Sequence, residues 1–300
     1  MTPSRLRPAL ALALAAAATA LTLPAQAQTT LEKVKGSGTI SVAYRESSIP
    51  FSYLDDKAQP VGFGVEICDR IVDEVKRATG RADLKVTRQS VTSANRIPLL
   101  VNGTIDIECG STTNNSDRGK QVAFATNYFY TGTRFLVKAD SGIKGMADLN
   151  NKVVVSTTGT TNFRIMRNLI TEQKLPIELI GAKDHSESAL LVESSRAAAF
   201  AMDDILLYGL RASAQNPASL AVVGEAIQVE PYAIMVRRED PAFKALVDGV
   251  LAGMMKSGEF TRLYTRWFQS PIPPRGINLN APMGKELTDN MKALSDKPAT

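Results

Sequence analysis

The sequence predicts an α/β protein made of two successive units in which strands and helices alternate. Short runs rich in β-branched residues alternate with stretches whose apolar residues recur at helical spacing. This rhythm starts near residue 39, pauses after residue 109 and starts again near residue 153. A strand, a helix and another strand in succession imply a mostly parallel sheet with helices on its faces.

The first unit opens with a strand over residues 39–43. A helix follows over residues 65–78, because its apolar residues return every three or four positions and Gly80 ends the pattern. The remaining predicted elements of this unit are a strand over residues 84–87, a short helix over residues 95–100 and a strand over residues 105–109.

A turn at Asn150-Asn151 introduces the second unit. Its predicted strands cover residues 153–155, 178–180 and 197–202, and its helices begin near Thr158 and at Asp203. The chain then returns through a strand over residues 232–236. Two helices follow, and the first begins at Asp240-Pro241, where Asp serves as N-cap and Pro suits the first turn.

The first 27 residues have the layout of a cleaved secretory signal. Arg5 and Arg7 precede an uncharged run over residues 9–23, and small residues close it at Ala25-Gln26-Ala27. A membrane helix is the alternative, but the run is shorter than the ~20 residues that a bilayer requires. Cleavage after Ala27 would lower the formal net charge from +5 to +3, because Arg5 and Arg7 leave with the signal.

The composition argues against several kinds of partner. Basic residues are scattered and not interleaved with aromatic residues, so no nucleic-acid partner is expected. The single histidine and two separated cysteines offer little for a metal site, and no cofactor is expected. In an oxidising compartment Cys68 and Cys109 invite a disulfide, although two buried thiols remain the alternative.

Several segments, in order along the chain, resemble the amino-acid-binding proteins of bacterial ABC importers. They are residues 44–53 (YRESSIPFSY), 61–63 (VGF) and 92–100 (TSANRIPLL). Four further segments are similar to the glutamate/aspartate branch of that family: residues 108–115 (ECGSTTNN), 182–185 (AKDH), 202–204 (MDD) and 271–274 (PIPP). The resemblance covers nearly the whole chain after the predicted signal.

This resemblance implies a two-lobed periplasmic binding protein fold of type II, with two βαβ lobes joined by two hinge strands. Lobe 1 would comprise residues 28–133 plus 231–300, and lobe 2 residues 134–230, with crossings near residues 133–137 and 229–233. The implied protein is a periplasmic monomer that binds L-glutamate or L-aspartate in the cleft and delivers it to an ABC permease in the inner membrane. A sensor module for a membrane receptor, or a dehydratase-like enzyme on this fold, stays the alternative.

The resemblance also implies a role for ten ligand-binding residues. Arg118 would hold the α-carboxylate, assisted by the amides of Thr160 and Thr161 at a helix start. Asp203 would pair with the ammonium group, helped by Ser111 and Thr113. The side-chain carboxylate would be held by Arg45 and Arg96 with Ser93 and His185. Three arginines and one aspartate give this site a charge of +2, which favours an acidic ligand.

Each residue also has an ordinary structural alternative. An arginine after a strand usually lies at the surface, Arg96 could merely flank its helix, and Arg118 could cap a carbonyl. A lone histidine such as His185 is more often structural than a ligand contact. Of the two adjacent aspartates we expect Asp204 to be the N-cap. No aromatic contact to the ligand is predicted.

Overall fold

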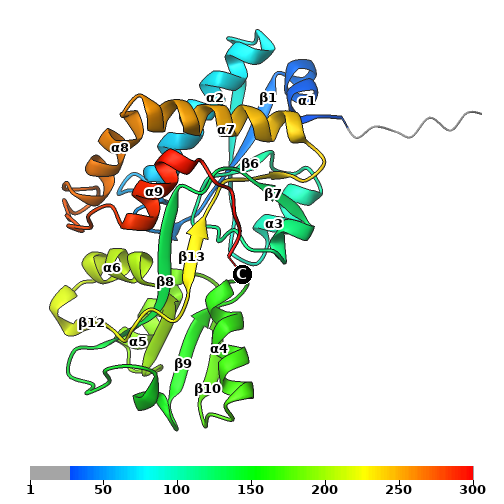
Figure 1. The fold of residues 1–300 in the computed structure, drawn as a ribbon. Coiled ribbons are helices and arrows are strands. Elements are labelled where there is room, and N and C mark those ends of the chain that lie inside the picture. Colours follow the sequence, from blue (N-terminus) through cyan, green and yellow to red (C-terminus); the bar gives the residue numbers. More distant parts are fainter. Residues whose placement is uncertain (1–27, 300) are drawn as a thin grey trace, which may run out of the picture.

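The computed structural model describes residues 28–299, which form two lobes that each surround a separate sheet (Figure 1). The predicted α/β class is therefore confirmed. The predicted secretory signal over residues 1–27 lies outside the described residues. Within residues 28–299, no helix combines the length and the apolar character that crossing a membrane requires.

The sheet of the first lobe has five strands in the order β5-β1-β6-β14-β7. β1 pairs in parallel with β5 and β6, whereas β14 runs antiparallel to β6 and β7 because it returns from the other lobe. The strands are β1 (Thr39–Tyr44), β5 (Lys85–Ser90), β6 (Ile107–Glu108), β7 (Val122–Phe124) and β14 (Met235–Arg237). The helices of this lobe are α1 (Thr30–Ser37), α2 (Phe63–Thr79), α3 (Arg96–Val101), α7 (Pro241–Lys256), α8 (Glu259–Phe268) and α9 (Lys285–Ala293).

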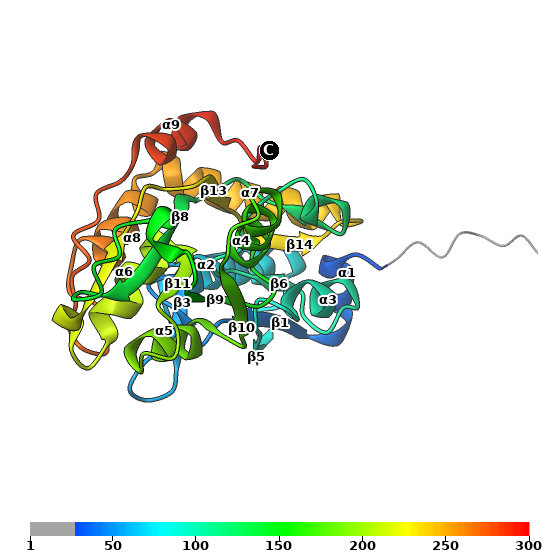
Figure 2. The ribbon, with the colours of Figure 1, turned by 90° about the horizontal axis from the view of Figure 1, so that it is seen from below.

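The sheet of the second lobe has the order β10-β9-β11-β8-β12, with β13 paired to β8. β9 is parallel to β10 and β11, and it lies between α4 and α5 when the molecule is seen from below (Figure 2). The strands are β8 (Phe129–Lys138), β9 (Val153–Thr157), β10 (Glu178–Ala182), β11 (Ala199–Asp203), β12 (Leu220–Val223) and β13 (Val229–Tyr232). The helices are α4 (Thr161–Glu172), α5 (His185–Glu193) and α6 (Asp204–Ser213).

Two strands, β8 and β13, connect the lobes. The first four residues of β8 pair with β13, and residues 133–137 pair with β11 inside the second sheet. β8 contains the residues of the first predicted crossing, 133–137, and β13 contains residues 229–232 of the second. The strand predicted over residues 232–236 is two strands, because the chain turns from β13 into the first sheet between Tyr232 and Met235.

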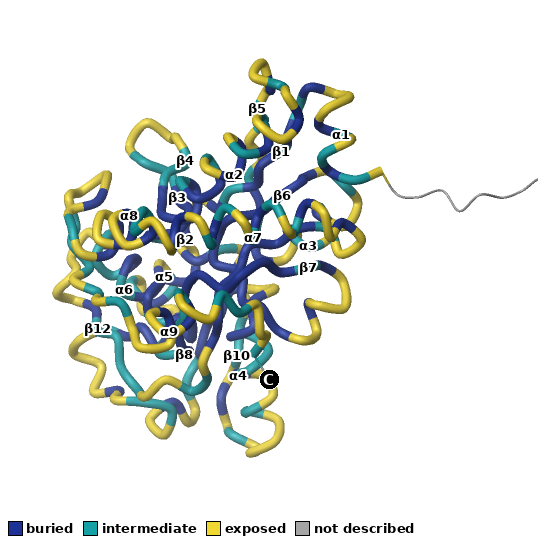
Figure 3. The backbone as a smooth tube through the Cα atoms, turned by 45° about the horizontal axis from the view of Figure 1, so that its top comes forward, coloured by how far each residue is buried: buried dark blue, intermediate teal, exposed yellow. Residues whose placement is uncertain are grey.

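Aromatic side chains anchor these hinge strands in the first lobe. Phe129 of β8 and Tyr232 of β13 both pack on Phe51, with ring centroids 4.9 and 5.2 Å apart. Phe268 of α8 stacks on Phe129 at 5.1 Å and also contacts Phe51 edge-on at 5.4 Å. Phe51 is completely buried and belongs to the core. Figure 3 shows that burial concentrates along the strands, while the outer turns of the helices are exposed.

A disulfide ties α2 to the first sheet. Cys68 lies on the buried face of α2 with Ile67, Ile71 and Val75, and it bonds Cys109 directly after β6 with Cα atoms 5.9 Å apart. Of the two alternatives that the sequence leaves open, the structure has the disulfide. This bond fixes the end of β6 immediately before Gly110 and Ser111, at the edge where the predicted site lies. A three-stranded sheet, formed by β2 (Ser47–Ser48), β3 (Ser52–Leu54) and β4 (Pro60–Val61), completes this edge.

Candidate ligand-binding site

The ten predicted residues lie where the two lobes face one another, and all ten are buried. Arg45 directly follows β1, and Asp203 ends β11, so both lie at the carboxyl ends of their strands, where open α/β sheets bind ligands. Side chains meet across the cleft: Arg45 contacts His185, and Thr113 contacts Thr161. The structure therefore brings residues from both lobes into one cluster.

Arg45 is a buried cation whose hydrogen bonds are incomplete. Its Nη2 donates to Ser93 Oγ at 2.9 Å and lies 3.3 Å from Nε2 of His185. Its Nη1 is buried and has no hydrogen-bond partner among the described residues. Burial and then repulsion by Arg96 lower the pKa of Arg45 to about 9. The alternative of a surface arginine is wrong, because only 1% of Arg45 is exposed.

Arg96, the first residue of α3, lies beside Arg45 and is equally buried. Its Nη1 lies 3.5 Å from the carbonyl oxygen of Ser111 and 3.9 Å from Oε1 of Glu108. Neither Nε of Arg96 nor Oε1 of Glu108 has a hydrogen-bond partner among the described residues. A buried guanidinium needs an acceptor, so this end of the cleft suits an anion.

His185 contacts Arg45 as a neutral acceptor. Burial and then the charge of Arg45 hold the pKa of His185 well below its usual value, so the ring is neutral near pH 7. A guanidinium only donates hydrogen bonds, so Nε2 of His185 accepts from Arg45 and Nδ1 carries the proton. That proton is donated to Thr157 Oγ1, 2.9 Å away. Both ring nitrogens are thus engaged, and His185 orients Arg45 from the second lobe.

Arg118 bridges the lobes near the opposite end of the cluster. Its Nη1 donates to the carbonyl of Thr113 at 2.9 Å, and its Nη2 donates to the carbonyl of Gly159 at 3.2 Å. Arg118 therefore does donate to carbonyl groups, as the structural alternative stated, but these two hydrogen bonds do not use all of its donors. A guanidinium has five N–H donors, so others remain for a carboxylate. Burial and then repulsion by Arg96 lower the pKa of Arg118 to about 9. A bound anion would raise this pKa again, because it stabilises the charged guanidinium.

Of the two amides predicted to bind an anion at the start of α4, that of Thr161 is more available than that of Thr160. The amide of Thr160 already donates to the carbonyl of Thr157 at 3.3 Å. The Thr160 hydroxyl caps the helix by accepting from the amide of Phe163 at 3.1 Å. The amide of Thr161, the first residue of the helix, is the better placed of the two for an anion.

The roles expected of the two adjacent aspartates are partly wrong. Asp203, and not Asp204, occupies the N-cap position of α6, and it makes no capping hydrogen bond with its side chain. The Asp203 carboxylate instead accepts from the hydroxyl of Tyr232 and from Nδ2 of Asn162, the latter at 2.7 Å. Asp204 is the first residue of the helix, and it accepts from Thr131 Oγ1 at 2.6 Å. Asp203 is therefore available to the cleft.

Sequence reasoning missed four buried residues of the cluster, namely Glu108, Asn162, Glu230 and Tyr232. Glu230 accepts hydrogen bonds from the hydroxyls of Thr113 and Thr161. Together, Glu108 and Glu230 offset the +2 charge that the predicted residues carry. Glu108 begins one of the segments that carry the family resemblance, but neither that resemblance nor the spacing gave it a role, and an isolated glutamate on a strand, such as Glu230, is usually solvated. Only the pairing of β13 with β8 places Glu230 in the cleft.

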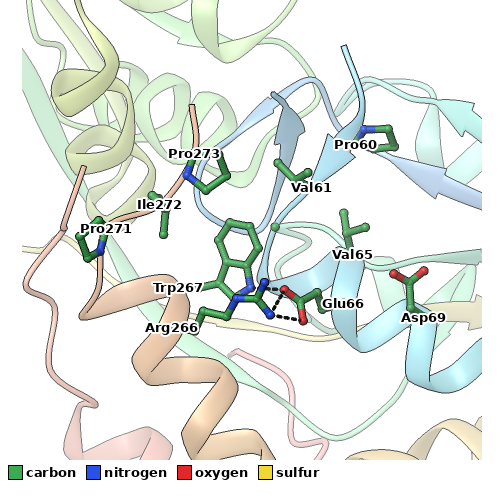
Figure 4. Close-up of a pocket in the computed structure, with 11 residues that line it drawn as sticks. Pro60, Val61, Val65, Glu66, Asp69, Arg266, Trp267, Pro271, Ile272 and Pro273 are labelled. Atoms are coloured by element: carbon green, nitrogen blue, oxygen red, sulfur yellow. Dashed lines mark hydrogen bonds and ion pairs between the residues drawn. The ribbon is translucent and has the colours of Figure 1, made fainter. Parts of the chain in front are cut away.

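A cavity of about 460 Å³ opens onto the cluster from outside, and Arg118, Thr160 and Thr161 line it. A second cavity of about 230 Å³ lies elsewhere, between α2, α8 and the proline-rich segment after α8 (Figure 4). Its charged residues are already paired: Glu66 accepts from Trp267 Nε1 at 3.0 Å and pairs with Arg266 at 3.0 Å, and Asp69 pairs with Arg88 outside the cavity at 2.7 Å. Residues 28–299 contain no group of three or more side chains that could hold a metal ion.

The sequence pattern of the bacterial extracellular solute-binding proteins, family 3, matches residues 40–270. The chain belongs to this family. Within it, an L-glutamate/L-aspartate-binding protein of Pseudomonas aeruginosa is 46% identical over 271 residues, which cover 90% of both chains. A glutamate/aspartate import solute-binding protein of Escherichia coli is 46% identical over 270 residues, which cover 90% of this chain and 88% of the relative.

Solved structures of solute-binding proteins confirm the predicted two-lobed fold of type II. A mutant of ArgBP from T. maritima superposes with a TM-score of 0.71 at 26% identity, over 80% of this chain and 99% of the other. An ancestral amino acid-binding protein, described as a precursor of cyclohexadienyl dehydratase, superposes with a TM-score of 0.68 at 27% identity, over 80% and 99% of the two chains. The fold is therefore shared by a protein described as a binding protein and by one described as the precursor of an enzyme.

If Asp203 holds the ammonium group of an amino acid, as the family resemblance implies, the affinity for that ligand should depend on pH. Burial and then the charge of Glu230 raise the pKa of Asp203 to about 7, with Asp204 adding to the effect while Tyr232 and Asn162 oppose it. An ammonium group beside Asp203 competes with the proton that Asp203 carries below this pH. The affinity for the ligand is therefore highest above pH 7, where Asp203 is ionised, and it falls by about tenfold between about pH 8 and about pH 6.

Calorimetric titration with L-glutamate across this pH range checks the prediction. Buffers with different ionisation enthalpies should also report proton release on binding near pH 6. A flat affinity between these pH values, with no proton released, would contradict it. Asp203→Asn should bind weakly at every pH, without the dependence.

Proposed function

We propose that this chain captures L-glutamate or L-aspartate between its lobes and delivers it to an ABC permease in the inner membrane. One observation carries the proposal: Arg45 and Arg96 are both buried, and each has a nitrogen without a partner among the described residues. Leaving a buried charge unpaired costs about 3–5 kcal/mol. A ligand with a carboxylate on its side chain removes that cost, and the two relatives named above are described as binding such ligands.

The local charge at this end of the cleft supports an acidic ligand. Arg45 and Arg96 contribute two positive charges, and Glu108 contributes one negative charge nearby. One further carboxylate neutralises this group. Glutamine would leave the group positive, and arginine would add a third cation. We infer that the protein rejects both because of charge and not because of size.

The head group of the ligand would lie toward the opposite end. There, the free N–H groups of Arg118 and the amide of Thr161 would hold the α-carboxylate. Asp203 would hold the ammonium group, helped by Ser111 and Thr113. Ser111 Oγ lies 3.1 Å from the hydroxyl of Ser48, so its position is fixed by the small sheet. In this arrangement Ser93 and His185 act by holding Arg45.

Ligand contacts from both lobes would favour the closed arrangement, which the permease would recognise. We propose lobes of residues 28–133 plus 231–300 and 134–230, with β8 and β13 as the hinge between them. Arg118 and Arg45 support this, because each contacts residues of the second lobe, at Gly159 and His185 respectively.

We propose that the protein works as a monomer in the periplasm, without a cofactor and without catalysing a reaction. Removal of residues 1–27 on export would leave the chain that binds. Catalysis of a dehydration would need a general acid or base in the cleft. His185 is the only histidine of the sequence, and both of its ring nitrogens are engaged, which favours binding over catalysis.

The proposal is tested by calorimetric titration of the chain after residue 27, stripped of bound ligand, with L-glutamate, L-aspartate, L-glutamine and L-arginine. We expect a Kd of roughly 1 μM for the acidic pair, about −8 kcal/mol, and no heat from the other two. Selective binding of another amino acid would leave the class intact but overturn the roles of Arg45 and Arg96. Silence from all four would contradict the proposal.

Two arginine variants test which carboxylate of the ligand each arginine binds. Arg118→Ala should abolish binding of every amino acid, because all share the α-carboxylate. Arg45→Ala should lower the affinity for L-glutamate by about 100-fold, the effect expected of a lost hydrogen bond between charged groups. It should also reduce the ratio of the affinity for L-glutamate to that for L-glutamine. Arg88→Ala, which alters an arginine exposed on β5 and paired with Asp69, is the control and should bind as the unaltered protein does. Retained glutamate affinity in Arg118→Ala would refute its role.

A glycine variant tests closure. Gly209 of α6 packs on Ile49 of the first lobe, and a Cβ atom there would lie 2.6 Å from the carbonyl oxygen of Ile49. Gly209→Ala should therefore keep the lobes apart and weaken L-glutamate by about tenfold, a loss of about 1.4 kcal/mol. Gly253→Ala in α7 is the matched control, because nothing lies within 4 Å of its Cβ. Small-angle scattering should show the control contracting with glutamate and Gly209→Ala contracting less; equal contraction would contradict the closure account.

A further inference from the structure

Glu230 lies in the middle of the hinge strand β13 and is completely buried. Its Oε2 accepts hydrogen bonds from two hydroxyls, Thr113 Oγ1 of the first lobe and Thr161 Oγ1 of the second. Its Oε1 accepts from Nε2 of Gln228 at 3.2 Å. A carboxylate on the hinge therefore touches both lobes inside the cleft, although the roles proposed above make no use of it.

The hydrogen bonds of Glu230 decide what the two threonines can offer a ligand. A hydroxyl carries one hydrogen and two acceptor lone pairs. When Thr113 and Thr161 donate their hydrogens to Glu230, only lone pairs remain toward the cleft. The two hydroxyl oxygens lie 3.3 Å apart, so they present two acceptors side by side. Such a pair suits an ammonium group, which only donates, and repels a carboxylate or carbonyl oxygen.

The charges around this pair have the same preference. The Asp203 carboxylate is held by the hydroxyl of Tyr232, which lies two residues after Glu230 on the same strand. Arg118 donates to the carbonyl of Thr113, whose hydroxyl donates to Glu230, so Arg118 and Glu230 flank the same threonine. Two carboxylates, Asp203 and Glu230, thus lie near the threonines with one guanidinium, whereas Arg45 and Arg96 have one carboxylate, Glu108, beside them.

We propose that Glu230 is a positioning residue that fixes where the ammonium group of the ligand binds. It orients the Thr113 and Thr161 hydroxyls as acceptors and adds a second negative charge beside Asp203. This inference rests on the proposed function, and it adds a specificity for the α-amino group to the specificity for the side-chain carboxylate. A ligand that enters in the reverse orientation would place a carboxylate against these acceptors.

The consequence is a defined discrimination between L-glutamate and 2-oxoglutarate. Both molecules carry the same two carboxylates, but 2-oxoglutarate has a carbonyl oxygen where glutamate has its ammonium group. Glu230→Gln keeps the shape of the side chain and removes its charge. This variant should lose about tenfold or more in affinity for L-glutamate, as expected for hydrogen bonds to charged groups, and should bind 2-oxoglutarate as well as or better than the unaltered protein.

Titration of both ligands into the same preparations tests this, with Glu108→Gln as the matched control. Glu108 is equally buried, but it lies beside Arg96 at the other end of the cleft. Its replacement should change the affinities for the two ligands in parallel and leave their ratio as it was. For Glu230→Gln the ratio should fall by at least about tenfold. A merely structural role for Glu230 would weaken both ligands equally, and that result would overturn the inference.

A second variant keeps the test decisive if Glu230→Gln does not fold. Thr113→Val removes one of the two acceptors and keeps the shape of the side chain, so it should reduce the preference for L-glutamate over 2-oxoglutarate in the same direction. An unchanged preference would count against Glu230. If the unaltered protein fails to bind L-glutamate at all, the proposed function fails first; if it binds and the ratio does not move, only the role of Glu230 fails.

Discussion

The site depends on a pair of guanidinium groups that are buried side by side with incomplete pairing. Arg45 and Arg96 are both buried, and the described side chains around them supply one nearby carboxylate, Glu108, one hydroxyl, Ser93, and the ring of His185. Two like charges in a desolvated cleft are stable only when an anion joins them. The fold holds both in place, since Arg45 directly follows β1 and Arg96 begins a helix of the same lobe. His185 then fixes Arg45 from the second lobe.

In the arrangement that we propose, the end of the cleft with Arg45 and Arg96 would bind the side-chain carboxylate of the ligand, and the end with Asp203 and Glu230 would bind its amino group. The latter end is built partly from the hinge. Tyr232 packs its ring into the aromatic cluster around Phe51 and donates its hydroxyl to Asp203, and Glu230 lies two residues earlier on β13. Because the proposed hinge strand also carries the groups that we propose to orient the amino group, recognition of that group and closure of the lobes would be coupled.

Much of the fold and of the candidate site could be predicted from the sequence. Apolar periodicity indicates the helices and strands, and the resemblance to a family indicates which residues form the site. The parallel order around β1 and the helices α2 and α4 follow from apolar spacing. The pairing of β8 with both β13 and β11 did not, because partners distant in the sequence leave no local pattern. The N-cap of α6 was misassigned by one residue, since adjacent aspartates are equivalent until the backbone fixes which precedes the helix. Glu230 was missed because its importance arises only from strand pairing.

The most direct measurement is a crystal structure of the chain with L-glutamate bound. The account predicts that the side-chain carboxylate accepts hydrogen bonds from Nη1 of Arg45 and Nε of Arg96, at about 2.7–3.2 Å, and that the ammonium group faces Asp203. A ligand in the reverse orientation, or a side-chain carboxylate held by Arg118 while these two nitrogens remain unpaired, would contradict it.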